Sequence, residues 1–393
     1  MIRSLLRAAL LLLLSLTAVQ GFADPAPGPG EPYELVRTLQ AVQDGIAHGD
    51  MAAHGDHIAL IRQIGEKFLA ADAGVWSHAQ NGQAVVIYLL SGGGPQLVRK
   101  LPRDRLNVDE RLFSGALAYV EGRQDDARDL LKDVKPRMLP SGLGGQVALV
   151  QGALFARSEA SLAIERLDDA RLLLPGTLVE EAALRREILL VGQAEDFDKF
   201  EFLTLAYIRH YRNSVYAGDF WQRFSSGLTQ SSLALDERRF ARIVTLLEQL
   251  DRASRLKLYF VIARNAMLRG RLAVALLAGE RALVLSADAS ADRERAHFFR
   301  GTARVLTDEY DGGLAELKAL DRSKLPERDI PLLNATVQLA LDMRKPFAGK
   351  SAAAADEPAV TPARLDLALS TATLARARTQ LGELERLTKG RRP

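Results

Sequence analysis

The stretch SGALAYVEGRQDDARDLL, from Ser114 to Leu131, predicts the fold of this chain. Its apolar residues recur at helical spacing. Gly115, Gly122 and Ala127 stand where the two helices of a hairpin would touch, and a small residue at each contact lets two helices approach closely. The stretch therefore predicts a helical hairpin.

The same arrangement occurs at two other places in the chain. Apolar residues recur at helical spacing from Tyr33 to about Met343, and the alternation typical of strands is almost absent. We expect an all-α fold whose hairpins form a tetratricopeptide-like solenoid over residues 33–344, and an irregular helical bundle is the alternative. The residues that carry the two further matches are Ala263, Gly270, Ala275 and Ala282, and then Ala163, Leu167, Ala170 and Pro175.

The first residues have the pattern of a secretory signal. Arg3 and Arg7 flank a basic start, residues 8–19 are apolar, and small residues precede a cleavage site between Ala23 and Asp24. The apolar run is shorter than the roughly 20 residues that a membrane span needs. We expect a signal peptide at 1–23, then a Pro/Gly-rich tether at 24–32. Because the sequence has no cysteine, neither a disulfide nor a lipidated cysteine is expected, and a free periplasmic protein is predicted.

Composition and charge argue against nucleic acid binding and catalysis. The formal charge of +3 loses two arginines with the predicted signal, and 50 basic against 49 acidic residues leave +1, too little for a nucleic-acid-binding surface. The chain has no Gly-x-Ser-x-Gly elbow, and its carboxylates alternate with arginines as on solvated helices. We expect no enzymatic activity.

Two short motifs could suggest a bound ion. His48, His54 and His57 lie close in sequence, but they supply only two ring nitrogens on one helix and no third ligand, so we interpret them as part of a polar turn. The run SGGGP, residues 91–95, is interpreted as a helix stop followed by a proline-started helix rather than a phosphate loop. We expect neither a metal nor a cofactor.

Residues 197–224 form the most aromatic segment, with nine of the 24 aromatic residues of the chain. Some of them share one helical face with Leu203, which favours a bulky core where two halves of the solenoid meet. The alternative is a partner surface, because interface hot spots favour aromatic residues and arginine. The candidate partner-binding residues of this segment are Tyr211, Trp221 and Arg223.

The C-terminal part changes in composition. Residues 345–360 are small, polar and bounded by prolines, which predicts a flexible linker. Residues 361–393 predict an amphipathic helix in which Leu367, Leu374 and Leu381 repeat every seven residues. This stripe either packs back on the solenoid, which we favour, or binds a partner helix, so the three leucines are also candidate partner-binding residues.

Four stretches, at residues 31–47, 86–95, 170–188 and 209–220, resemble the MotC family, which comprises periplasmic motility proteins of alphaproteobacterial flagellar motors. The similarity runs from about residue 32 to about residue 343. The resemblance implies a non-enzymatic protein needed for flagellar rotation, with the periplasmic part of the stator protein MotB as its partner. It brings no catalytic or binding residues with it.

Two other functions fit the residues alone. One is a general periplasmic tetratricopeptide-like envelope adapter. The other is a peptidoglycan-processing protein, which would need a catalytic glutamate domain after the solenoid, where the sequence has only the predicted linker and helix.

Overall fold

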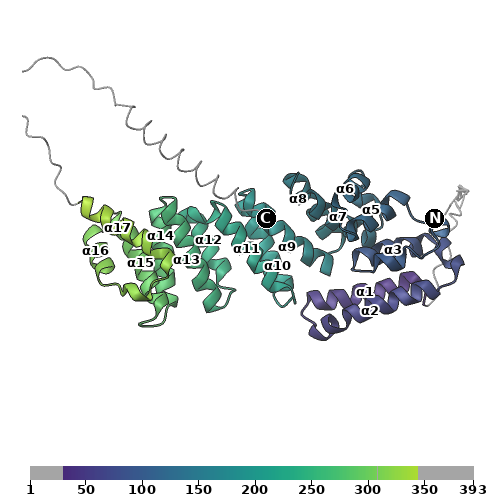
Figure 1. Cartoon of the computed structure of the whole chain (residues 1–393), viewed down its shortest axis with the longest axis horizontal. Coiled ribbons are helices and arrows are strands. Elements are labelled where there is room, and N and C mark those ends of the chain that lie inside the picture. Colours follow the sequence, from purple (N-terminus) through teal and green to yellow (C-terminus); the bar gives the residue numbers. More distant parts are fainter. Residues whose placement is uncertain (1–29, 308, 344–393) are drawn as a thin grey trace, which may run out of the picture. The chain divides into compact units, whose positions relative to one another are not determined.

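The computed structural model describes residues 30–307 and 309–343, and within these ranges every regular element is helical (Figure 1). The predicted all-α class is therefore confirmed. The predicted signal peptide with its cleavage site at Ala23 and Asp24, most of the tether, the linker 345–360 and the C-terminal helix lie outside the described residues. The α-helices are α1 (Pro32–Ala47), α2 (Met51–Ala70), α3 (Ala79–Leu90), α4 (Pro95–Val98), α5 (Glu110–Val120), α6 (Gln124–Leu131), α7 (Ser141–Phe155), α8 (Ala160–Leu173), α9 (Leu178–Gln193), α10 (Phe197–Tyr211), α11 (Ala217–Gln230), α12 (Glu237–Leu247), α13 (Arg252–Leu268), α14 (Leu272–Leu285), α15 (Ala291–Val305), α16 (Tyr310–Lys318) and α17 (Ile330–Met343).

Successive helices pair as the small residues predict. In the hairpin α5–α6, a Cβ placed on Gly115 would lie 2.6 Å from the side chain of Leu131, so only glycine allows this approach without a shift. The expectation that Gly122 and Gly270 also stand at helix contacts is wrong. They make the turns of α5–α6 and α13–α14, at φ +79° and +67°, a region that favours glycine. The structure is thus a helical-repeat fold of packed hairpins.

The first two helices match the sequence closely, with two differences. The α1 helix begins at Pro32, inside the expected tether, because proline suits the first turn of a helix. Asp50, which follows Gly49 and is a residue type that favours the N-cap position, caps α2 and accepts a hydrogen bond of 2.9 Å from the amide of Ala53. Helical spacing predicts that Ile58 and Leu69 belong to the buried face of a helix from Met51 to about Ala70. This prediction is wrong, because their exposed fractions are 69% and 44%. Both lie on parts of α2 that its main neighbours, α1 and α4, leave uncovered.

The hairpin α1–α2 also contacts helices far along the chain. Asp44 of α1 accepts a hydrogen bond of 2.9 Å from the backbone amide of Leu178, the first residue of α9. Gly49, at φ +102°, lies so close to Asn213 that a Cβ would come within 2.6 Å of its carbonyl oxygen. Contacts of α1 with α9 therefore join segments more than 130 residues apart.

The buried apolar residues form two large clusters and a smaller third. One large cluster lies within α1 to α7, and the other lies mainly within α9 to α17. Most of the aromatic segment belongs to the second cluster, where the rings of Tyr207 and Phe220 stack with centroids 3.7 Å apart. The described helices fall almost wholly in one compact unit, which ends at Asp342. None of the helices that the structure describes is long and apolar enough to cross a membrane.

Candidate protein-binding clefts

The structure places the three candidate partner-binding residues of the aromatic segment, Tyr211, Trp221 and Arg223, in different environments. Tyr211 is completely buried, and its hydroxyl donates a hydrogen bond of 2.7 Å to Glu180 of α9. Burial raises the pKa of Tyr211 far above its usual range, and the nearby Glu180 carboxylate adds to this. Tyr211 is therefore a core residue that offers no exposed atoms to a partner. Helical spacing placed it correctly on a face with Phe200 and Tyr207, but spacing does not reveal that α9 covers this face.

Trp221 lies at a surface cleft of about 810 Å³ between α11 and α13. Leu250, Leu258 and Val261 give this cleft an apolar lining, and Arg212, Lys257 and Asp251 add charged groups. Arg223 does not line it. The Nε of Arg223 donates to Asp219 at 3.0 Å, and Asp219 also pairs with Arg185. Of the three candidates, Trp221 is the one that reaches a hollow surface. Leu367, Leu374 and Leu381 lie outside the described residues.

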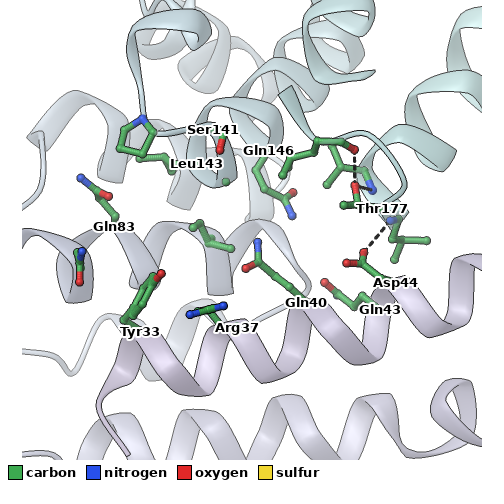
Figure 2. Close-up of a pocket in the computed structure, with 17 residues that line it drawn as sticks. Tyr33, Arg37, Gln40, Gln43, Asp44, Gln83, Ser141, Leu143, Gln146 and Thr177 are labelled. Carbon is green, nitrogen blue, oxygen red and sulfur yellow. Dashed lines mark hydrogen bonds between the residues drawn. The ribbon is translucent and has the colours of Figure 1, made fainter. Parts of the chain in front are cut away.

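A second cleft, of about 350 Å³, lies among α1, α3, α7 and α9 (Figure 2). The sequence analysis missed it, because its lining residues come from four separated helices. Its most unusual feature is a set of five glutamines. No short sequence motif indicates that these residues come together. They are Gln40 and Gln43 of α1, Gln80 and Gln83 of α3, and Gln146 of α7.

Two of these glutamines are buried and fixed by the turn that follows α3. The amide of Gln43 donates to the carbonyl oxygen of Ser91 at 3.0 Å, and the amide of Gln146 donates to the Ser91 hydroxyl at 3.4 Å. Ser91 caps α3, and Gly92 then turns at φ +102° before Pro95 starts α4. The expected helix stop is confirmed, and it has a further effect: it positions Ser91 between the two glutamines.

The other polar groups of this cleft differ in whether they have partners among the described residues. Among the described residues, the side chains of Gln40 and Gln83 make no hydrogen bond to another residue, and Figure 2 shows both at the open space between the helices. The guanidinium of Arg37 lies over the ring of Tyr33, 5.7 Å from its centroid. Asp44 is held by the amide of Leu178; burial raises the pKa of Asp44, although this hydrogen bond and His48 oppose the rise.

A smaller cleft of about 210 Å³ adjoins the glutamine-lined cleft and shares Gln43, Gln146, Leu178 and Val179 with it. It extends to His57, whose Nε2 lies 3.0 Å from the Gln43 amide nitrogen. Burial lowers the pKa of His57, and the charge of nearby His54 lowers it further. The described residues include no group of three or more His, Cys, Asp or Glu side chains placed to bind a metal.

Comparison with known proteins then gives the family. The model of the family described as chemotaxis protein MotC matches residues 1–393. The chain belongs to the MotC family. It is similar to the chemotaxis protein MotC of Rhizobium meliloti (strain 1021), with 31% identity over 330 residues, which cover 83% of this chain and 75% of that protein. No solved structure matches the chain. The resemblance predicted from the four sequence stretches is confirmed, and the protein is a member of a chemotaxis and motility family.

Proposed function

We propose that this protein is a non-enzymatic periplasmic motility protein required for flagellar rotation, and that its tetratricopeptide-like helical scaffold binds the periplasmic part of the stator protein MotB. The observation that carries the proposal is the match of the whole chain to the MotC family. The predicted signal peptide supports the periplasmic location. The packed hairpins support the binding role, because helical-repeat proteins typically use their extended surfaces to bind other proteins.

The buried carboxylates support a role without catalysis. Glu181, Glu187 and Asp329 have fully buried side chains, and such groups in a cleft would be candidates for acid–base chemistry. Each of them instead pairs with an arginine, at 2.8 Å to Arg185, 2.9 Å to Arg171 and 2.6 Å to Arg295 respectively. The Glu187–Arg171 pair joins α9 to α8, the Asp329–Arg295 pair joins the turn before α17 to α15, and the Glu181–Arg185 pair lies within α9, so all three have a structural role. They disfavour the alternative of a peptidoglycan-processing protein.

Swimming in a clean in-frame deletion strain tests the proposal, with filaments counted by electron microscopy in the same cells. We expect full-length filaments on cells that do not swim, and restored swimming when the whole chain is expressed. A version without residues 1–23 should accumulate without restoring swimming, because it would not be exported. Normal swimming in the deletion strain would reject the proposed function.

Direct binding separates the stator partner from a general adapter. The chain from Asp24 onward is titrated with the purified periplasmic part of MotB, and we expect saturable binding. A general envelope adapter predicts a different result, in which MotB does not bind and the deletion strain shows envelope defects beyond lost motility.

A further inference from the structure

The glutamine-lined cleft has chemistry that the proposed function does not by itself explain. A primary amide side chain carries two N–H donors and a carbonyl acceptor, the same kinds of group as a peptide bond. Gln40 and Gln83 both line the cleft, and these groups of theirs are unpaired among the described residues. A half-buried amide without a partner gains a hydrogen bond when a ligand supplies complementary groups.

The charge and the apolar lining of the cleft narrow the ligand class. Arg37 and Asp44 are its two charged residues, and their charges are opposite, so the cleft favours neither a polyanion nor a polycation. Ile87, Leu143 and Leu178 provide an apolar wall beside the amides. This combination suits a ligand with alternating amide groups and apolar side chains.

The size of the cleft suits a short extended segment. Its α1 wall runs from Tyr33 to Asp44, eleven residues on, and at about 1.5 Å of rise per residue this wall is roughly 17 Å long. An extended chain advances about 3.3 Å per residue, so about five residues would fill that length. The adjoining smaller cleft lets the chain continue past Gln43 and Gln146.

We propose that the glutamine-lined cleft binds an extended, largely uncharged polypeptide segment of a partner protein, with Gln40 and Gln83 hydrogen-bonded to its main chain. Recognition through the main chain gives affinity, and the apolar wall selects side chains. The identity of the partner as a motility protein rests on the proposed function. The inference that the cleft binds a polypeptide rests only on the residues that line it.

A glycan strand is the competing ligand, because hydroxyl groups also pair with amides. Sugar rings are commonly bound against the exposed face of an aromatic ring. Among the residues that line the cleft, the aromatic one is Tyr33, and the guanidinium of Arg37 already lies over its ring. The geometry therefore favours a polypeptide, and glycan binding becomes an outcome of the test.

Gly142, in the first turn of α7, provides a matched pair of variants. A Cβ at this position would lie 4.0 Å from Gln40 Nε2 and 4.0 Å from Ile87 Cδ1, which is ordinary contact. Gly142→Ala should leave the cleft open, whereas Gly142→Phe should fill it. The double variant Gln40→Ala/Gln83→Ala removes the free amides without filling the space. Far-ultraviolet circular dichroism and thermal unfolding show whether each variant keeps its fold.

The experiment selects linear dodecapeptides from a phage-displayed random library on the chain from Asp24 onward, and then titrates the enriched peptides as free synthetic ligands. We expect Gly142→Phe to raise the Kd at least about tenfold, the double glutamine variant to raise it roughly five- to tenfold, and Gly142→Ala to leave it unchanged. Soluble peptidoglycan fragments are titrated on the same variants.

Three results would overturn the proposal: no enriched peptide, peptides that bind Gly142→Phe as tightly as the original chain, or peptidoglycan fragments whose binding depends on Gly142 while that of peptides does not. Titration of the periplasmic part of MotB on the same variants distinguishes failure of the cleft proposal from failure of the proposed function. If MotB binds and Gly142→Phe leaves that binding unchanged, the proposed function stands but the cleft is not the stator-binding site. If peptides bind in the cleft and MotB does not bind, the cleft proposal stands and the proposed stator binding fails.

Discussion

Glu187 of α9 shows how single residues hold neighbouring helices together. Its side chain is fully buried, and it contacts Arg171 of α8 and Lys199 of α10, each at 2.9 Å. Asp168 pairs with the same two cations. Burial raises the pKa of Glu187 to about 7, an effect that the charge of Arg171 opposes and that of Asp168 reinforces. This carboxyl therefore takes up a proton near neutral pH.

The raised pKa predicts a pH-dependent stability. Because the folded state holds the proton more tightly than the unfolded chain, Glu187 contributes stability below its unfolded pKa and loses it as the pH rises through the folded value. A rise from 4.5 to about 7 corresponds to about 3 kcal/mol between roughly pH 4.5 and pH 8. Urea unfolding of the wild type and of Glu187→Gln at four pH values measures this, since the variant lacks the titration.

The informative quantity is the difference in unfolding free energy between the wild type and Glu187→Gln. The wild type should lose stability relative to the variant as the pH rises. Taking the difference cancels His57, whose lowered pKa acts in the opposite direction in the same range. Asp168 does not interfere: burial raises its pKa, but Lys199 and Arg171 outweigh burial and lower it, so it titrates at lower pH. A difference that stays constant with pH would contradict the assignment.

At the level of helices, the sequence predicted where helices form better than it predicted which of their faces are buried by neighbouring helices. Gly115 was expected at a helix contact and lies at one, and Asp50, a residue type that favours the N-cap position, caps α2. Gly122 and Gly270 were expected at contacts of the same kind, but both lie in turns at positive φ. Ile58 was expected in the core and is exposed, because a helical face is buried only where a neighbour covers it. Which helix covers which face depends on contacts between distant segments, and spacing within one helix does not encode these.

One close contact between helices joins α9 and α11. A Cβ on Gly192 would lie 2.7 Å from the Cα of Gly227, so the contact is backbone against backbone. At Gly115 the neighbouring atoms belong to the flexible side chain of Leu131, which can move. Gly55, on α2, has no atom within 4 Å of such a Cβ. These three glycines therefore test what close approach contributes.

Alanine at each of the three positions should give a graded result. Gly192→Ala should destabilise the protein by about 1–3 kcal/mol because α9 and α11 must separate. Gly55→Ala should stabilise it by about 0.5–1 kcal/mol, since alanine is the better helix former. Gly115→Ala should fall between the two. Thermal and urea unfolding measure the order, and a Gly192→Ala variant as stable as Gly55→Ala would show that the helix contact is looser than described.

On the scale of the described unit, the glutamine-lined cleft depends on the contact between α1 and α9, which lie far apart in the sequence. A strict solenoid brings each hairpin into contact only with its neighbours. Here α1 contacts α3 and also α9, and α7 contacts both α3 and α9, so four helices enclose the cleft. The periodicity of the sequence predicted helices throughout this region but not this closure. The five glutamines therefore gave no signal of a common site.

This closure predicts that α1 and α9 open together. Asp44→Ala removes the acceptor for the amide of Leu178 and should cost about 1–2 kcal/mol locally. Hydrogen exchange read by mass spectrometry should then show faster exchange in both α1–α2 and α9–α11. The helices α13–α15 should be unchanged, because none of them packs substantially against α1. Asp44→Asn is the matched control, since its amide oxygen can still accept the hydrogen bond. Faster exchange confined to α1–α2 would mean that the hairpin opens alone, and the cleft would then be a weaker binding site than its four walls indicate.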